Sequence, residues 1–275
     1  MKKLILSSSP DRDGILRLRE KDYHYLVRVR RLKPGAVFDA LLPGNIETKL
    51  SVISVNDGVL TVQCMVTHDS IADCAALLTP VYLFQALPKG NKMDLIVRQA
   101  AEAGVSHILP FESEYSQVKI ALSLDNTQGA STGEKVRRWT RIIREARQQS
   151  GSLIPTAVEA PLKLQGLLDY WKKLKKDHES GVGILLHQDP LEQQGTFHDY
   201  LKDNPEFTVL AVGPEGGFSS AEAARFLAEG FKPLKMGNTI LRTETAALYG
   251  VAAIRIILSE SAAWGPKFPH SSGNV

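Results

Sequence analysis

The pattern of apolar and polar positions changes character once along the chain. In the first part, short β-type runs at residues 37–42, 50–55 and 59–66 are separated by turn dipeptides such as Pro43-Gly44 and Asp57-Gly58. Closely spaced runs of this kind are typical of hairpins in a small barrel. We therefore expect a β-rich domain of about seventy residues at the N-terminus. A weakly patterned stretch at residues 69–79 is expected to be its linker.

After Pro80, runs of strand length alternate with longer segments of helical period. The expected strands cover residues 81–86, 105–111, 154–158, 183–186, 207–212 and 231–236, and the expected helices begin near Met93, at Glu134, at Leu162, after Ser219 and near Thr243. This alternation predicts an α/β domain around a parallel sheet. Pro233 should confine the last strand to an edge or irregular position. The last helix is apolar over most of its circumference, so it should pack inside the domain or against a partner subunit.

A glycine-rich turn follows the strand at residues 207–212. Residues 213–218 read Gly-Pro-Glu-Gly-Gly-Phe, and glycine permits backbone angles and close approaches that side chains forbid. Ser219 and Glu222 then have the spacing of a capping box, which predicts the start of a helix. Because ligands of open α/β sheets bind beyond the carboxyl ends of strands, the turn is a candidate binding site. The alternative is a plain strand-to-helix connection.

Two further strands end in loops of unusual composition. One loop contains His187, and the other runs from Gly237 to Arg242. If the three strands lie side by side, their end loops enclose one pocket. His187 could act there as a base; the alternative is a loop histidine with no proton-transfer role, because no second ligand or nucleophile is spaced with it. No metal site is predicted.

Composition limits the classes of protein that remain. A hydrophobic content of 43% and a charged content of 23% are ordinary for a globular protein and argue against global disorder. The formal net charge of +3 is too small to imply a nucleic-acid partner by itself. Cys64 and Cys74 show no paired spacing, which favours a reducing compartment. With neither a signal-peptide core nor a bilayer-spanning apolar run, we expect a cytoplasmic protein without a membrane partner.

Positive charge is concentrated in two places. The first is residues 12–33, where Arg28, Arg30 and Arg31 follow the rings of Tyr23 and Tyr25. Cations beside rings that can stack suit an RNA partner. The alternative is a solvated helix face with tyrosines in the core.

The second concentration is the helix that begins at Glu134. Arginines on the face opposite its apolar positions, or flanking that face, are Arg137, Arg141, Arg144, Arg138 and Arg147. Arginines around one exposed side favour a phosphate-rich partner over plain solubility. Arg137, Arg141 and Arg144 are therefore candidate RNA contacts.

Two signatures carry a resemblance to a known family. They are residues 213–219, Gly-Pro-Glu-Gly-Gly-Phe-Ser, and residues 236–246, Met-Gly-Asn-Thr-Ile-Leu-Arg-Thr-Glu-Thr-Ala. Supporting matches lie at residues 88–94, 103–106, 139, 141–142 and 149–151. In this order and spacing, the chain from the region of His24 to Leu258 resembles the bacterial 16S ribosomal RNA uridine N3-methyltransferases, which belong to the SPOUT class.

The resemblance implies a trefoil-knotted α/β methyltransferase domain that binds S-adenosylmethionine, works as a homodimer and follows a PUA-like β-barrel for RNA. The implied boundaries are residues 1–72 for the barrel, 73–262 for the knotted domain and 263–275 for a disordered tail. The carried-over cofactor positions are Leu186, His187, Gly213, Glu215, Gly216, Gly217, Met236, Gly237, Ile240 and Leu241. The implied partner is 16S ribosomal RNA or the small ribosomal subunit.

The implied reaction is methyl transfer to N3 of a uridine, which must lose its proton to become a nucleophile. Arg242 is the candidate for stabilising the oxyanion that develops on the base. Glu215 and Glu244 are candidate proton acceptors, and the alternative for each is a carboxylate that braces a loop or a helix end.

Three positions depart from the usual pattern of the family. Thr239, Tyr115 and Ser152 stand where arginine is common, which removes cations from positions expected to face RNA. Three other functions are left open: methylation of another RNA nucleotide, a non-catalytic RNA-binding factor of ribosome assembly, and a phosphate-utilising α/β enzyme. The last is weakened by the absence of GxGxxG and GxxxxGK[ST] motifs.

Overall fold

The computed structural model describes residues 4–6, 8–43, 46–65, 78–118, 132–188 and 194–260. The described residues of 1–76, together with 147–153, form one compact unit, and those of 77–146 and 154–275 form another. Cys74, most of the predicted linker and the predicted tail lie outside the described residues. Within the described ranges, no helix is both long and apolar enough to cross a membrane.

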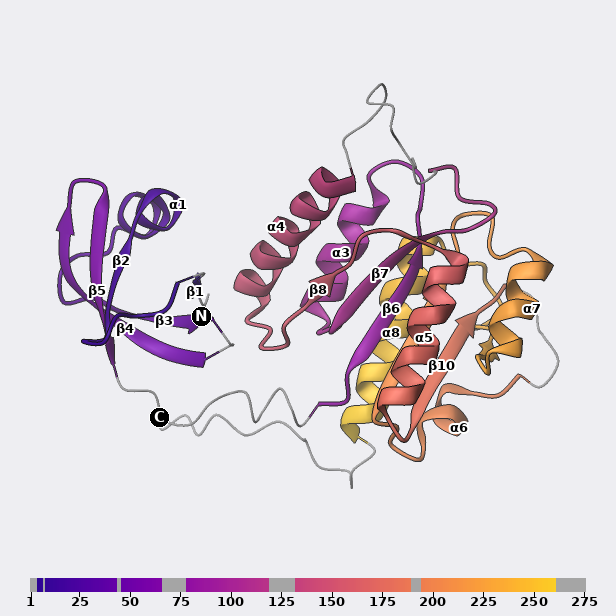
Figure 1. The fold of residues 1–275 in the computed structure, drawn as a ribbon. Coiled ribbons are helices and arrows are strands. Elements are labelled where there is room, and N and C mark those ends of the chain that lie inside the picture. The colour runs from indigo at the N-terminus through magenta and orange to yellow at the C-terminus, as the bar shows by residue number, and fades with distance from the viewer. Residues whose placement is uncertain are drawn as a thin grey trace. The chain divides into compact units, whose positions relative to one another are not determined.

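The N-terminal unit is built on a five-stranded sheet (Figure 1). Its strands are β1 (Leu4–Ile5), β2 (Ile15–Leu18), β3 (Val37–Leu42), β4 (Ile46–Asn56) and β5 (Val59–Met65), in the spatial order β1-β3-β4-β5-β2. β1 pairs with β3 in parallel and the other pairs are antiparallel, so the predicted hairpins are confirmed. After the short α1 (Glu20–Tyr23), the π-helix η1 (His24–Val29) places Leu26 in the same core as Leu50 and Val52.

The second unit is built on a parallel sheet. Its strands are β6 (Val81–Ala86), β7 (His107–Glu112), β8 (Ala157–Val158), β9 (Leu162–Lys163), β10 (Gly181–Leu186), β11 (Phe207–Val212) and β12 (Lys232–Leu234). Their spatial order is β12-β10-β11-β6-β7-β8, with β9 also paired to β7, and all of these pairs are parallel. The predicted α/β class is therefore confirmed.

Helices cover both faces of the parallel sheet (Figure 1). One face carries α3 (Lys92–Glu102), α4 (Thr132–Ser150), α6 (Phe197–Leu201) and α8 (Thr243–Glu260), and the other carries α5 (Leu164–Asp177) and α7 (Ser220–Ala228). Alternate strand residues point to opposite faces. Leu83 and Leu210 pack with the first group of helices, whereas Phe84 and Val209 pack with the second. Because both faces are covered, the inner strands are apolar throughout, which is the pattern that predicted them.

Prolines explain where the strand boundaries differ from prediction. The strand expected at residues 154–158 is reduced to β8, which begins after Pro155, and the helix expected from Leu162 begins only after β9. Pro110 of β7 lies between the segment that pairs with β8 and the segment that pairs with β9. Because proline lacks an amide donor, two short strands share this edge of β7. β12 lies at the edge of the sheet, as Pro233 indicated.

Helix α8 buries one face and exposes another. Ala247, Val251 and Ile254 are buried against the sheet, but Tyr249 is 62% exposed and Ile256 is 54% exposed. Packing inside the domain therefore buries only part of the apolar surface of α8.

Two helical glycines should respond in opposite ways to the same substitution. At Gly250 in α8, an added Cβ would lie 2.7 Å from Leu210 Cδ2 and 3.3 Å from Leu186 Cδ1. At Gly166 in α5, the nearest atom would be Leu162 Cδ2 at 3.8 Å, an ordinary contact. We expect Gly250→Ala to lower the free energy of unfolding by about 1–3 kcal/mol and Gly166→Ala to raise it by about 0.5–1 kcal/mol. Urea denaturation measures both, and a stabilising Gly250→Ala would contradict the close packing of α8 on the sheet.

Candidate functional site

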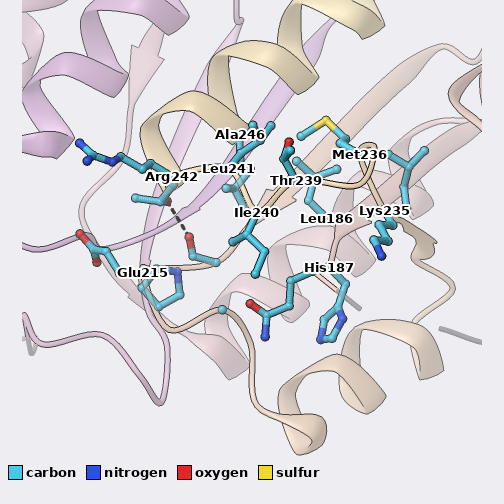
Figure 2. Close-up of a pocket in the computed structure, with 17 residues that line it drawn as sticks. Leu186, His187, Glu215, Lys235, Met236, Thr239, Ile240, Leu241, Arg242 and Ala246 are labelled. Carbon is cyan, nitrogen blue, oxygen red and sulfur yellow. Dashed lines mark hydrogen bonds between the residues drawn. The ribbon is translucent and has the colours of Figure 1, made fainter. Parts of the chain in front are cut away.

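The three strand ends that the sequence singles out meet around one pocket (Figure 2). β10 pairs with β11 on one side and with β12 on the other, so their carboxyl ends lie at the same edge of the sheet. The pocket encloses about 250 Å³. It is lined by Leu186, His187, Gln188, Val212, Gly213, Pro214, Glu215, Gly217, Leu234, Lys235, Met236, Thr239, Ile240, Leu241, Arg242, Thr243 and Ala246.

Most of the carried-over cofactor positions lie in this lining. They are Leu186, His187, Gly213, Glu215, Gly217, Met236, Ile240 and Leu241. Gly216 and Gly237 are not part of it. Gly216 lies against Tyr115, where an added Cβ would be 3.0 Å from the Cβ of the tyrosine, and Gly237 has a φ of 69°. Neither glycine faces the cavity. Gly216 permits the close approach to Tyr115, and Gly237 permits a left-handed backbone conformation.

The turn after β11 is tight enough to require glycine. Gly217 donates its backbone N–H to the Pro214 carbonyl at 3.0 Å and has a φ of 71°, in the left-handed region. A Cβ on Gly213 would lie 3.0 Å from the carbonyl carbon of Gly217, so a side chain there would push the turn apart. The turn therefore brings backbone polar groups to the pocket wall, where a ligand can contact them directly.

Helix α7 begins with the predicted capping box, which is confirmed. Ser219 Oγ accepts from the Glu222 N–H at 3.2 Å, and Glu222 Oε2 accepts from the Ser219 N–H at 3.1 Å. The buried Glu222 carboxylate also accepts from Ser113 Oγ and from the Glu114 N–H, each at 2.9 Å. Glu222 thus ties the glycine turn to the loop after β7, a contact that the local spacing could not reveal.

Arg242 lies at the pocket wall immediately before α8. Its side chain is exposed and makes no hydrogen bond or ion pair within the part of the chain that the structure describes. Arg242 and Glu215 lie on the same side of the pocket, away from His187 (Figure 2). His187 is partly exposed and donates its backbone N–H to the Leu234 carbonyl at 3.0 Å. Because the Arg242 guanidinium is exposed and unpaired among the described residues, it is available to a ligand.

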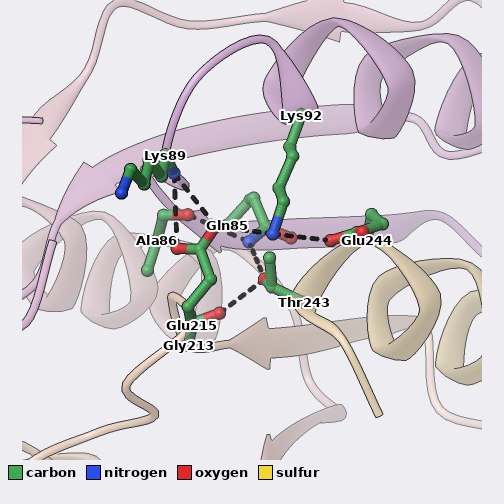
Figure 3. Close-up of polar contacts among 8 residues, drawn as sticks. All are labelled: Gln85, Ala86, Lys89, Lys92, Gly213, Glu215, Thr243 and Glu244. Carbon is green, nitrogen blue, oxygen red and sulfur yellow. Dashed lines mark hydrogen bonds and ion pairs between the residues drawn. The ribbon is translucent and has the colours of Figure 1, made fainter. Parts of the chain in front are cut away.

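Lys92, the first residue of α3, joins the two candidate carboxylates (Figure 3). Its Nζ lies 2.8 Å from Glu215 Oε1 and 3.4 Å from Glu244 Oε2, the second contact being an ion pair longer than a good hydrogen bond. The two Glu215 oxygens also accept the backbone N–H of Lys89 at 3.2 and 3.3 Å. Glu215 lines the pocket and Glu244 does not. The motif at residues 88–94 indicated no such bridge.

The hydrogen bonds in this cluster hold both partners in their charged forms. Burial raises the pKa of the Glu215 carboxyl, but hydrogen bonds from Lys92, from its own amide and from the Lys89 amide outweigh burial and hold that pKa below 4.5. The pKa of the Lys92 ammonium is raised above 10.5, chiefly by its hydrogen bond to Glu215. Both groups are therefore charged around neutral pH.

A second, uncharged contact joins the same two loops. The Thr243 hydroxyl donates to the Gly213 carbonyl at 2.6 Å and accepts from Gln85 Nε2 at 3.1 Å (Figure 3). Gln85 Nε2 also donates to the Ala86 carbonyl at 2.9 Å. Gln85 and Thr243 are buried, so these hydrogen bonds are not exposed to competition from water. The sequence signal that could have indicated them is a lone glutamine in an otherwise apolar strand.

The candidate RNA contacts lie in two places: Arg28 in η1 with Arg30 and Arg31 directly after it, and the other three arginines in α4. Their exposure is greatest at Arg28, Arg31, Arg137 and Arg141, and Arg30 and Arg144 are partly exposed. Arg141 forms a long ion pair of 3.8 Å with Glu145 one turn later. The six candidate arginines are therefore exposed to different degrees.

The expectation that Arg147 flanks an exposed basic face is wrong. Arg147 is buried and donates to the Leu153 carbonyl at 3.4 Å. It follows the buried Ile143 by one helical turn, so it belongs to the buried side of α4. Arg138 is exposed but paired with Asp94 of α3. The basic surface of α4 is consequently smaller than the sequence indicated.

The positions that depart from the usual pattern have different surroundings. Thr239 is exposed and lines the pocket, whereas Tyr115 is 49% exposed beside Gly216. Ser152 is partly exposed and donates its N–H to Ser150 Oγ at 3.2 Å. Only Thr239 therefore stands at the pocket itself.

A parallel sheet covered on both faces, with a glycine-shaped pocket at the carboxyl ends of its strands, defines an α/β protein that binds its ligand at that edge of the sheet. Residues 76–255 match the model of the RNA methyltransferase domain family. The ribosomal RNA small subunit methyltransferase E of Aquifex aeolicus is 30% identical over 248 residues, which cover 89% of this chain and 95% of that protein. The protein of the same name from Bacillus subtilis is 28% identical, with 85% and 87% covered. The chain belongs to the ribosomal RNA small subunit methyltransferase E family.

Solved structures have the same fold. A protein of Legionella pneumophila assigned as a methyltransferase, in complex with its cofactor SAM, is 25% identical with a TM-score of 0.72, covering 93% of this chain and 97% of its own. The ribosomal RNA small subunit methyltransferase E of Neisseria gonorrhoeae, bound to S-adenosylmethionine, is 21% identical with a TM-score of 0.74, and the coverage is 94% and 98%. The likeness extends over both compact units.

Proposed function

We propose that the chain transfers the methyl group of S-adenosylmethionine to N3 of a uridine in the 16S ribosomal RNA of the small subunit. Membership of the family makes it an RNA methyltransferase, and the names of its relatives refer to small-subunit ribosomal RNA. The observation that carries the proposal is the pocket formed by three loops, with Arg242 at its wall. A ribosomal substrate also supports the predicted cytoplasmic location.

The side chains around the pocket fit S-adenosylmethionine. Apolar walls from Leu186, Met236 and Leu241 suit an adenine ring, and backbone groups of Gly213 and Gly217 suit its polar edge. The cofactor supplies an electrophilic methyl group on a cationic sulfonium. Ile240 is 81% exposed beside the pocket, and a ligand or a partner subunit would cover it.

The residues of the chain would act on the uridine. Arg242 would stabilise the negative charge that develops on the uracil oxygens as N3 loses its proton. Glu215 and Glu244 are ion-paired carboxylates beside the same wall, and they remain our candidates for receiving that proton. Holding N3 in line with the methyl group would supply much of the remaining rate enhancement.

The finer fold assignment and the RNA surfaces belong to the same proposal. β12, the last strand, pairs with β10, which supports a chain path that crosses earlier loops as a trefoil knot of the SPOUT class does. The mainly antiparallel five-stranded sheet supports a PUA-like barrel in residues 1–72, followed by a catalytic domain in 73–262. Arg28, Arg30, Arg31, Arg137, Arg141 and Arg144 would contact RNA phosphates.

We also propose a homodimer whose interface includes the exposed face of α8. Leu248, Tyr249 and Ile256 are 37%, 62% and 54% exposed and lie on one helix, where an unpartnered apolar stripe favours association. Tyr249→Asp should convert the dimer to a monomer in sedimentation equilibrium, because a buried carboxylate would lack a partner. Ile53→Asp, at a 47% exposed residue of β4, is the matched control and should leave the dimer intact. A wild-type monomer would refute the dimer.

The central test is to incubate the full chain with labelled S-adenosylmethionine and small ribosomal subunits, digest the RNA and identify the labelled nucleoside by mass spectrometry. We expect 3-methyluridine in 16S ribosomal RNA. Label on a ribose 2′-oxygen or in transfer RNA would redirect the substrate assignment within the class. RNA binding without affinity for S-adenosylmethionine in calorimetry would instead support a non-catalytic assembly factor.

A further inference from the structure

We propose that Lys92 is a positioning residue for methyl transfer: it holds the carboxylates of Glu215 and Glu244 in one charged cluster at the side of the pocket. This inference rests on the proposed function. Lys92 is not itself part of the pocket lining, so its effect on the reaction must pass through Glu215, which is.

The cluster joins three segments that are far apart in the sequence. Lys92 begins α3, Glu215 lies in the turn after β11, and Glu244 lies in the first turn of α8 (Figure 3). Both carboxylates contact the same Nζ, at 2.8 and 3.4 Å. The two contacting oxygens therefore lie within about 6 Å of each other, a range in which like charges repel strongly.

The position of Lys92 in its own helix indicates that it stabilises the carboxylate cluster and not the helix. A cation in the first turn is opposed by the partial positive charge of the helix N-terminus. α3 has no side-chain cap at Asn91, and Asp94, the acidic residue of its first turn, is paired with Arg138. Ion pairs to two carboxylates from other segments supply the compensating interaction.

Two sets of contacts hold the glycine turn and the start of α8, one neutral and one ionic, and they have different effects. The Gln85–Thr243–Gly213 hydrogen bonds fix the backbone of the glycine turn against the start of α8. The Glu244–Lys92–Glu215 contacts then determine charge, because one ammonium and two carboxylates carry a net charge of −1 beside the pocket. Without Lys92 the two carboxylates would carry −2, and Glu215 would lose the cation that favours its charged form.

The structure therefore predicts that Lys92 sets the pH range in which the Glu215 carboxylate is ionised. In Lys92→Met, loss of the Lys92 hydrogen bond and positive charge should raise the pKa of the Glu215 carboxyl, so the acid limb of the kcat profile should move to higher pH by about one unit. On the acid side of the profile we expect kcat of Lys92→Met to fall below the wild-type value and to recover as the pH rises. Affinity for S-adenosylmethionine should change less.

Three further variants distinguish a Lys92 that positions the carboxylates from a Lys92 that only stabilises the fold. Lys92→Arg should retain most of the activity, because it keeps the charge. Adding Lys92→Met to Glu215→Gln should change the profile little beyond Glu215→Gln alone, because the effect of Lys92 passes through Glu215. Lys172→Met removes a lysine of α5 whose Nζ also lies 2.8 Å from a carboxylate, Glu229, outside the pocket, and it should leave the profile unchanged.

The decisive measurement combines these pH profiles with carbon-13 NMR titration of the Glu215 carboxyl carbon in the full chain without cofactor. A raised carboxyl pKa in Lys92→Met, together with the shifted kcat profile, supports the inference. An unshifted profile and an unchanged titration in a folded Lys92→Met protein overturn it. If wild-type protein methylates no ribosomal RNA, the proposed function fails, and the NMR titration still decides whether Lys92 controls the carboxylates.

Discussion

Replacing Arg242 with alanine is expected to lower kcat for uridine methylation about 100-fold or more, with the affinity for S-adenosylmethionine changed less than about threefold. As N3 loses its proton, negative charge develops on the uracil oxygens, and a guanidinium offers a fixed positive charge with directed donors. Arg242 lies at the pocket wall just before α8, whose N-terminus adds partial charge of the same sign. Its loss should therefore raise the energy of the transition state more than that of the bound cofactor.

Two comparisons make the Arg242 result specific. Arg225→Ala removes an arginine of α7 that donates to Gln165 at 2.5 Å away from this pocket, and kcat should remain at the wild-type value. Arg242→Lys keeps the charge without the planar fork of donors and should give an intermediate rate. Single-turnover rates and calorimetry provide the two readouts. An unaltered rate would remove Arg242 from the mechanism, and a parallel loss of cofactor affinity would assign it to cofactor binding.

Replacing Thr243 with valine should weaken binding of S-adenosylmethionine about tenfold. Valine preserves the shape of the side chain but removes the hydroxyl that donates to Gly213 and accepts from Gln85. The buried Gly213 carbonyl would then lose this donor, and the turn that lines the pocket would shift to find another. The free energy of unfolding should fall by about 1–3 kcal/mol, the cost of an unsatisfied buried polar group.

The same substitution at Thr208 is a matched control. Thr208 is buried in β11, and its hydroxyl has no hydrogen-bond partner among the residues described. Thr208→Val should therefore leave cofactor affinity unchanged and should not destabilise the protein. Thr243→Ser retains the hydroxyl and should bind within about twofold of wild type. If Thr243→Val binds as tightly as wild type in calorimetry, the hydroxyl does not organise the pocket.

Local patterns in the sequence predicted most elements of the α/β unit because they depend on neighbouring residues. The apolar run at residues 207–212 became β11 with the same bounds, and Ser219 with Glu222 formed the expected capping box. The errors arose where a distant contact decided the outcome. The strand at residues 154–158 shortened beside Pro155, and Arg147 turned out to be buried. Spacing along a helix indicates a face but not how far its buried side extends.

The pocket was predictable only in outline. Three strand ends with unusual residues indicated that a ligand site could form if β10, β11 and β12 were neighbours, and pairing in the sheet makes them so. The contacts that hold the loops were not predictable, because Gln85 and Thr243 are separated by 158 positions. Lys92 and Glu215 are separated by 123. In neither pair does the sequence around one residue indicate which distant residue it contacts.

The sequence by itself determined the glycine turn at residues 213–218, the capped helix after it, most strands and helices of the α/β unit, though not β9 or α6, and the signatures that led to the family. These features follow from backbone sterics, capping hydrogen bonds and side-chain periodicity, all of which act over a few residues. Only the tertiary structure decided which loops meet, which arginines reach the surface and which cation neutralises the carboxylates beside the pocket. The physical reason is that charge and burial depend on groups that folding brings together from distant positions.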